Sequence, residues 1–179
     1  DTPGSTDLIG AAIACLPAVE TVAVVINATS GIEIVTRRMM EAARDRNLPR
    51  AIVINKIVAP DTDLEALVSQ IQETFGHECL PINLPTGGGK AVVECLLNNS
   101  GESDFGDVKA AHSAILDQIV EMDEGLMEKY LGGEERNYEA LPDPFERARE
   151  EGHVVPICFA DAKNGVAIPE LLDTIVKHY

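Results

Sequence analysis

The sequence predicts an α/β protein with a parallel sheet, and three observations indicate this class. Apolar runs rich in β-branched residues occur at Thr21–Ile26, Ala51–Ile54 and Val154–Cys158, as in strands that are covered on both faces. Helical patterns at Gly31–Arg46 and Asp61–Phe75 follow the first two runs. Polar residues follow the second and third runs, at the strand ends where open parallel sheets bind ligands. The pattern therefore favours parallel strands connected by helices.

The expected helices have signals at their ends. Leu8–Leu16 is an apolar stretch that Pro17 ends, so we expect a short helix there. In the helix that ends at Phe75, Asp61 or Thr62 is expected to cap the first turn, and Gly76 is expected to stop the last one. The stripe expected to face the core in Gly31–Arg46 consists of Ile32, Val35, Met39 and Ala43.

A last helix is expected at about Ile168–His178, because Pro169 stands where the first turn of a helix tolerates it. Its apolar residues recur with helical spacing. The four that we expect to point inward are Leu171, Leu172, Ile175 and Val176.

The alternation of strands and helices breaks between the second and third strands, over residues 77–151. Short β-like runs at 78–84 and 91–97 flank a glycine turn. An acidic linker, a helix at 108–130 and a short helix near 144–150 follow. We expect an inserted α+β subdomain at 77–151, and a partial parallel-sheet domain made of residues 1–76 and 152–179.

The charge of the chain restricts its partners. It has 179 residues and a formal net charge of −16, from 30 acidic and 14 basic residues. Binding to free nucleic acid is disfavoured, because it needs clustered Lys and Arg. No apolar stretch approaches the length of a membrane span, so no membrane contact is expected.

The four cysteines, Cys15, Cys79, Cys95 and Cys158, are widely spaced and form no C-x-x-C pair. This spacing is unlike that of a zinc site or a redox pair. We expect four buried, reduced thiols in a cytoplasmic protein.

The glycine turn at Thr86–Lys90 has the composition of a phosphate-binding loop. A P-loop, G-x-x-x-x-G-K-[ST], would need glycine at 84 and serine or threonine at 91, where Leu84 and Ala91 stand. The spacing therefore favours a hairpin turn over a phosphate site.

Three short motifs carry the functional interpretation. Asp1, Thr2, Pro3 and Gly4 form D-x-x-G before the first helix, and Asn55–Lys56 follows the second strand. Asp161, Ala162 and Lys163 follow the third strand. Each motif alone recurs by chance, and Asn55–Lys56 alone could be a polar turn. Their order and their positions at strand ends make them informative together.

In this order the motifs resemble those of the translational GTPases, and most closely elongation factor G. Val24–Glu33 is similar to a strand and helix entry of that family. Asp123–Leu131, the most specific stretch, resembles a segment of its inserted subdomain. Val155–Pro156 and Leu171–Asp173 match the closing strand and helix. An unrelated flavodoxin-like or NAD-binding protein would need a glycine-rich phosphate turn after a first strand, which this sequence lacks.

The resemblance implies a P-loop GTPase-type fold and a role for each motif residue. Asp1 would hold Mg²⁺ through water, and Gly4 would sense the γ-phosphate of GTP. Asn55, Lys56 and Ala162 would frame the guanine base, with Asp161 and Lys163 beside Ala162. The full-length protein would bind GTP or GDP with Mg²⁺ and couple hydrolysis to ribosomal translocation.

Two residues depart from the family pattern. Ser5 stands at the position of the catalytic histidine, and a hydroxyl cannot act as an imidazole. Val58 stands where the family has an aspartate that accepts hydrogen bonds from guanine. These departures favour the alternative that the domain is degenerate and acts, without hydrolysis, as a ribosome-binding or regulatory module.

The resemblance also predicts what surrounds this chain. It would run from switch II to the end of the G domain, as a fragment whose P-loop, switch I and first strands are absent. We therefore expect no nucleotide binding and no activity from this segment alone. The ribosome is the expected partner, including the acidic stalk protein through the insertion. The exposed edge of strand 21–26 could also pair with a second copy.

Overall fold

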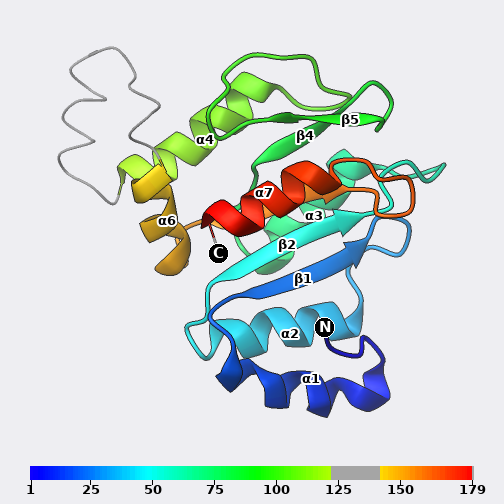
Figure 1. The fold of residues 1–179 in the computed structure, drawn as a ribbon, viewed down its shortest axis with the longest axis vertical. Helices are drawn as coiled ribbons and strands as arrows, with labels where there is room; N and C mark the ends of the chain where they lie inside the picture. Colours follow the sequence, from blue (N-terminus) through cyan, green and yellow to red (C-terminus); the bar gives the residue numbers. More distant parts are fainter. Residues whose placement is uncertain (122–141, 179) are drawn as a thin grey trace.

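The computed structural model describes residues 1–121 and 142–178 (Figure 1). Its main sheet has four parallel strands in the order β1-β2-β6-β3. These strands are β1 (Val22–Asn27), β2 (Arg50–Asn55), β6 (Val155–Ala160) and β3 (Cys79–Pro81). The predicted α/β class with a parallel sheet is confirmed.

Helices cover the sheet. α2 (Ile34–Arg44) packs on β1, α3 (Leu64–Phe75) contacts β3, and α7 (Ile168–His178) contacts β6. Figure 1 shows α7 crossing the face of the sheet that is turned to the viewer, with α2 next to β1 and α1 (Ile9–Cys15) beyond α2. α1 lies between two short 3₁₀ helices, η1 (Thr6–Leu8) and η2 (Leu16–Ala18).

The core is centred on the two middle strands. Every residue of β6 is buried, and every residue of β2 except its last, Asn55. The run of apolar residues in β6 and most of β2 is what a parallel strand needs when helices cover both faces. The loops that follow β2 and β6 therefore start from the buried middle of the sheet.

A second, two-stranded antiparallel sheet is formed by β4 (Asn83–Thr86) and β5 (Ala91–Glu94). It is fixed to the main sheet by Asn83, whose Oδ1 accepts the backbone N–H of Phe159 at 2.7 Å and whose Nδ2 donates to the Phe159 carbonyl at 3.4 Å. Buried amides need such partners. α4 (Val108–Val120) and α6 (Pro142–Glu150) complete the described part of the region predicted as the insertion.

The run predicted at 78–84 divides between the two sheets. Its first part, β3, pairs with β6 in the main sheet, and its last part belongs to β4. Ile82 lies at the division and donates its N–H to the Ile157 carbonyl at 3.0 Å. Residues 79–81 thus belong to the main sheet, although they lie inside the range predicted as the insertion.

The helix ends differ from the predictions by a few residues. α2 begins at Ile34 instead of Gly31, and its deeply buried residues are Thr36, Met40 and Ala43. In the predicted stripe, Ala43 is buried as expected, whereas Ile32, Val35 and Met39 are only partly buried. The cap of α3 is Asp63, whose Oδ1 accepts the Ala66 N–H at 2.9 Å, whereas Gly76 ends the helix as predicted.

The prediction that α7 buries four apolar residues is wrong for three of them. Leu172, Ile175 and Val176 are 55%, 44% and 84% exposed, and Leu171 alone packs against the core. α7 lies along β6, so one side of its apolar surface is covered by the described residues. Helical spacing identifies an apolar face, but it does not say how much of that face has a neighbour.

α4 confirms the first part of the helix predicted at 108–130, and α6 confirms the helix near 144–150. The family-like stretch Asp123–Leu131 lies outside the described residues. Among the residues that are described, no helix is long and apolar enough to cross a membrane.

All four cysteines are free, but Cys15 is exposed, so the prediction of four buried thiols is wrong for it. It lies in the last turn of the short helix α1, which has a single buried residue, Ala12. The three other thiols are buried, and burial raises the pKa of Cys79, Cys95 and Cys158 to about 12. These three thiols are therefore protonated and unreactive at neutral pH.

Candidate functional site

The parallel pairing of β2 with β6 brings two of the predicted motifs together. Asn55 and Ala160 are register partners at the carboxyl ends of these strands. The Asn55 Oδ1 accepts the backbone N–H of Lys56 at 2.8 Å and that of Ala162 at 3.0 Å. One amide side chain therefore joins loops that are 107 residues apart in the sequence.

Lys56 has a left-handed backbone, with φ of 66°. Residues other than glycine adopt this conformation infrequently, and they do so mostly where surrounding bonds impose it. Here the bond from Lys56 N–H to Asn55 and the bond from Ala59 N–H to the Lys56 carbonyl, at 3.0 Å, form a tight turn. The turn leaves the Lys56 residue exposed at the strand end.

Asp161 points into the protein and not toward solvent. It is 3% exposed, and its Oδ1 accepts the backbone N–H of Asn164 at 3.0 Å and the side-chain Nδ2 of the same residue at 2.9 Å. Its Oδ2 accepts the N–H of Val58 at 3.3 Å. This carboxylate therefore ties the loop after β6 to the loop after β2. Lys163, next to it, is exposed.

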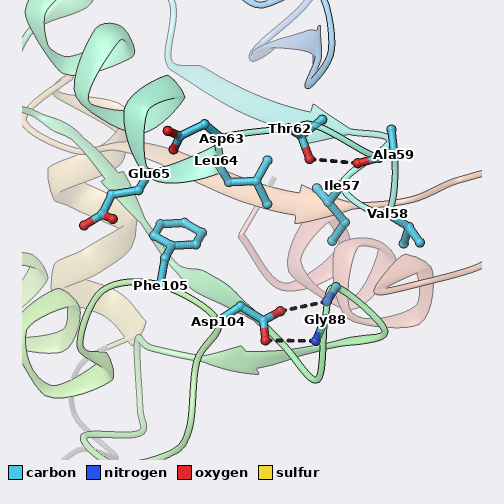
Figure 2. A pocket seen from close by; sticks show the side chains of 11 residues that line it. Ile57, Val58, Ala59, Thr62, Asp63, Leu64, Glu65, Gly88, Asp104 and Phe105 are labelled. Carbon is cyan, nitrogen blue, oxygen red and sulfur yellow. Dashed lines mark hydrogen bonds between the residues drawn. The ribbon is translucent and has the colours of Figure 1, made fainter.

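The glycine turn forms the hairpin between β4 and β5, and its amides bind a carboxylate of the same chain (Figure 2). Gly88 and Gly89 donate to the two oxygens of Asp104 at 2.9 and 2.7 Å. Gly87, Gly88 and Gly89 all have positive φ, which other residues adopt at a cost in energy. The prediction of a hairpin turn is confirmed.

The glycine turn also touches the loop after β2. A Cβ at Gly89 would lie 3.3 Å from the carbonyl oxygen of Ile57. These residues line a groove of about 610 Å³. Figure 2 shows the turn and Asp104 on one side of it and Ile57 and Val58 on the other. Nothing in the sequence between residues 86 and 104 indicated this contact, because it depends on how the second sheet folds back.

The N-terminal motif lies at a different place in the structure. Residues 1–4 line a second groove of about 390 Å³ beside α1, α2 and β1. Asp1, Gly4 and Ser5 are exposed, and within residues 1–121 and 142–178 no hydrogen bond or ion pair involves the side chains of Asp1 and Ser5. The structure thus brings together the motifs at 55–56 and 161–163, and it records no bond between either of them and residues 1–5.

The described residues offer few ligands for Mg²⁺ and few donors for a triphosphate. No group of three His, Cys, Asp or Glu side chains that could hold a metal occurs in the described part of the chain. Asp1 is a single carboxylate, and a single carboxylate binds Mg²⁺ when waters and substrate phosphates supply the other ligands. The glycine amides at 88 and 89 are already occupied by Asp104.

The residues fit a nucleobase better than they fit phosphate. Asn55, Lys56 and Ala162 converge at one strand end. The Nδ2 of Asn55 makes no hydrogen bond within the described residues, so it is available to donate one. The Val58 side chain provides no acceptor, however, so the fit to guanine is incomplete at this position.

Sequence reasoning missed two contacts of this site. It did not predict the inward direction of Asp161, or the binding of Gly88 and Gly89 by Asp104. A turn of three glycines followed by an aspartate was the available signal, but spacing alone does not say which acceptor the amides meet. Both contacts involve residues at least 15 positions apart, whose distance is set by the tertiary fold.

Comparisons with known proteins identify the family of this chain. The family model described as the Elongation factor Tu GTP binding domain matches residues 1–179. An elongation factor G-like protein of Thermotoga maritima is 30% identical over 97% of this chain and 27% of its own length. One of Mycobacterium tuberculosis, also described as elongation factor G-like, is 30% identical over 100% of this chain and 27% of its own.

Two further relatives extend the comparison. The tetracycline resistance protein TetW of Butyrivibrio fibrisolvens is 26% identical over 98% of this chain and 25% of its own length. A crystal structure of a Thermus thermophilus protein superposes with a TM-score of 0.85 and 30% identity, covering 99% of this chain and 29% of that one. The chain thus spans about a quarter of the length of the curated relatives it matches. It belongs to the family of the elongation factor Tu GTP binding domain and is a G domain of the translational GTPase type.

Proposed function

We propose that the full-length protein is an elongation factor G-like GTPase that couples GTP binding and hydrolysis to ribosomal translocation. The observation that supports this best is the hydrogen bond from Ala162 N–H to Asn55 Oδ1, which holds the two expected base-binding loops together. A base-binding site needs such a fixed frame, because a ligand that must order loops binds less tightly.

Each proposed role uses the chemistry of one side chain. Asn55 would contact the base through its Nδ2, and the methylene chain of Lys56 would lie along the base plane. Ala162 would line the base through its backbone, with Asp161 holding its loop and Lys163 exposed beside it. Asp1 and Gly4 would approach Mg²⁺ and the terminal phosphate. Bound GTP would supply the phosphoryl group that is transferred to water.

A second candidate function is a G domain that binds the ribosome or regulates without hydrolysis. Two residues favour it: Ser5, which has no imidazole, and Val58, which has no side-chain acceptor. Histidine orients or deprotonates attacking water in ways that a serine hydroxyl, with an ordinary pKa far above neutrality, does not.

A two-step assay on the full-length protein separates these functions. Binding of GTP and GDP is measured first, and the hydrolysis rate with and without ribosomes is measured second. Micromolar or tighter binding together with a ribosome-dependent rate supports the GTPase. Nucleotide binding without a stimulated rate supports the non-hydrolysing module, and absence of binding contradicts the GTPase.

We also propose the partners and location that follow from this function. The protein would act in the cytoplasm at the factor-binding site of the ribosome, with the insertion meeting the acidic stalk protein. Co-sedimentation with ribosomes tests the first contact. Loss of co-sedimentation from ribosomes that lack the stalk tests the second.

A further inference from the structure

The chemistry of purine bases defines what a guanine-selective site must contain. Guanine presents two donors, N1–H and the N2 amino group, and hypoxanthine has N1–H but lacks the amino group. A protein that selects guanine needs an acceptor for both donors, usually a carboxylate, because charge-assisted pairs are strong. A site without that acceptor gains nothing from the amino group.

The side chain at position 58 cannot supply the acceptor. Val58 is 37% exposed, and its side chain is aliphatic. Its backbone N–H is a donor, and it is already bonded to Asp161 Oδ2 at 3.3 Å. Figure 2 shows Val58 at the edge of the loop after β2, across the groove from the glycine turn.

Three of the nearby carboxylates are engaged elsewhere. Asp161 is 3% exposed and receives three hydrogen bonds from the protein. Asp104 holds the glycine turn with both oxygens, and Asp63 caps α3. Asp61 is exposed and three positions beyond Val58, so it would reach a base only if the loop changed its path.

The loop after β2 is held in its present path from several sides. Gly89 lies against Ile57, where a Cβ would come within 3.3 Å of the carbonyl oxygen. Ile57 is 4% exposed, and its N–H points to the Ala160 carbonyl at 3.5 Å. The hydroxyl of Thr62 donates to the Ala59 carbonyl at 2.9 Å. A rearrangement that carried Asp61 to the base would break several of these contacts.

We propose that the base site of this chain does not read the N2 amino group and binds hypoxanthine nucleotides as tightly as guanine nucleotides. Val58 is then the residue that sets base specificity. The contacts that remain, from Asn55, Lys56 and Ala162, meet parts of the purine that guanine and hypoxanthine share. This inference rests on the proposed nucleotide-binding function and specifies its ligand class.

The test is competition binding to the full-length protein, with GTP and ITP displacing a fluorescent GDP analogue. The affinities for GTP and ITP are expected to differ by less than about threefold. Val58→Asp restores an acceptor and is expected to raise the preference for GTP about tenfold or more, as one bidentate pair does between bases. Val176→Asp is the matched control, because it adds the same charge at a residue of α7 that is 84% exposed, and its ratio of GTP to ITP affinity is expected to stay unchanged.

Three results would overturn the inference, and they differ from one another. A preference for GTP over ITP of tenfold or more in the unaltered protein contradicts the inference but not the proposed function. If Asp61→Asn then abolished that preference, the loop after β2 would have to rearrange to bring Asp61 to the base. Nucleotide binding with no effect of Val58→Asp would place the base elsewhere. Absence of any nucleotide binding would remove both the inference and the proposed function.

Discussion

β1 and β2 are neighbouring parallel strands of six residues, and both end in asparagine, yet they differ in environment. β2 has a strand on each side and is buried up to its last residue, whereas β1 has β2 on one side and alternates between buried and exposed residues in its first five positions. Asn55 connects its loop to Ala162, but Asn27 bonds within its own loop, to Thr29 and Ser30.

The difference shows that a strand's place in the sheet, more than its sequence, decides what its terminal residue can do. Asn27 and Asn55 are register partners and have the same side chain. A loop that follows a central strand has another strand end beside it, so its polar residues can join two loops. A loop at the sheet edge lacks one of these neighbours.

The largest expected effect comes from truncating an apolar residue in each strand. Ile54→Ala in β2 removes a side chain that is 0% exposed and is expected to lower the free energy of unfolding by about 2–5 kcal/mol. Val25→Ala in β1, where the residue is 59% exposed, is expected to cost less than about 1 kcal/mol. Urea denaturation of both variants measures this, and equal losses would contradict the contrast between the strands.

The second comparison replaces the paired asparagines. Asn55→Ala leaves the N–H groups of Lys56 and Ala162 without their acceptor, and a loss of about 1 kcal/mol is expected. Asn27→Ala affects bonds inside one solvated loop and is expected to cost about 0.5 kcal/mol or less. Nucleotide affinity of the full-length protein should fall in the first variant and stay within about twofold in the second. A comparable fall in both would show that Asn27 also shapes the site.

A third comparison concerns two glycines, one in the glycine turn and one in α1. Gly89→Ala adds a Cβ against Ile57 at a residue with φ of 73°, and a loss of about 1–2 kcal/mol is expected. Gly10→Ala in α1 meets nothing within 4 Å, and it is expected to stabilise by about 0.5–1 kcal/mol through helix propensity. Thermal unfolding checks that Gly89→Ala lowers the melting temperature and that Gly10→Ala raises it. A neutral Gly89→Ala would mean that the glycine turn does not hold the loop after β2.

The smallest effect on stability is expected at the open edge of the sheet. We propose that the 179-residue chain self-associates through β1, which has an unpaired edge among the described residues and an uncharged sequence from Val22 to Asn27. Val25→Lys is expected to weaken this association while changing the unfolding free energy by less than about 0.5 kcal/mol. Sedimentation at several concentrations measures it, with Val176→Lys on α7 as the control. A monomer at all concentrations before substitution would contradict the proposal.

The sequence was sufficient for much of the fold. Buried parallel strands are continuous apolar runs, so β1, β2 and β6 were predicted to within two residues, and Gly76 marked the end of α3. The strand β3 was assigned to the insertion, because three residues with a proline do not reveal which sheet they join. The exposure of Leu172 and Val176 could not be predicted, since the spacing of apolar residues in a helix does not say which elements pack against them.

The candidate site was predicted only in part. Asn55 and Ala162 were expected at one site, because the family resemblance placed both of them around the base. The direction of Asp161 was not predicted, because a carboxylate can face a ligand or its own loop with the same sequence. The contact between the glycine turn and Asp104 was not predicted either, because it depends on the path of the chain from residue 89 to residue 104, which local spacing does not specify.

Amide hydrogen exchange of the full-length protein, with and without GDP and Mg²⁺, tests most directly whether a nucleotide base binds where β2 and β6 end. Binding at this corner is expected to slow exchange in residues 55–58 and 161–164 while leaving residues 27–31, at the end of β1, nearly unchanged. GDP binding that protects residues 27–31 but not the loops after β2 and β6 would contradict the account. Absence of any protection would contradict it as well.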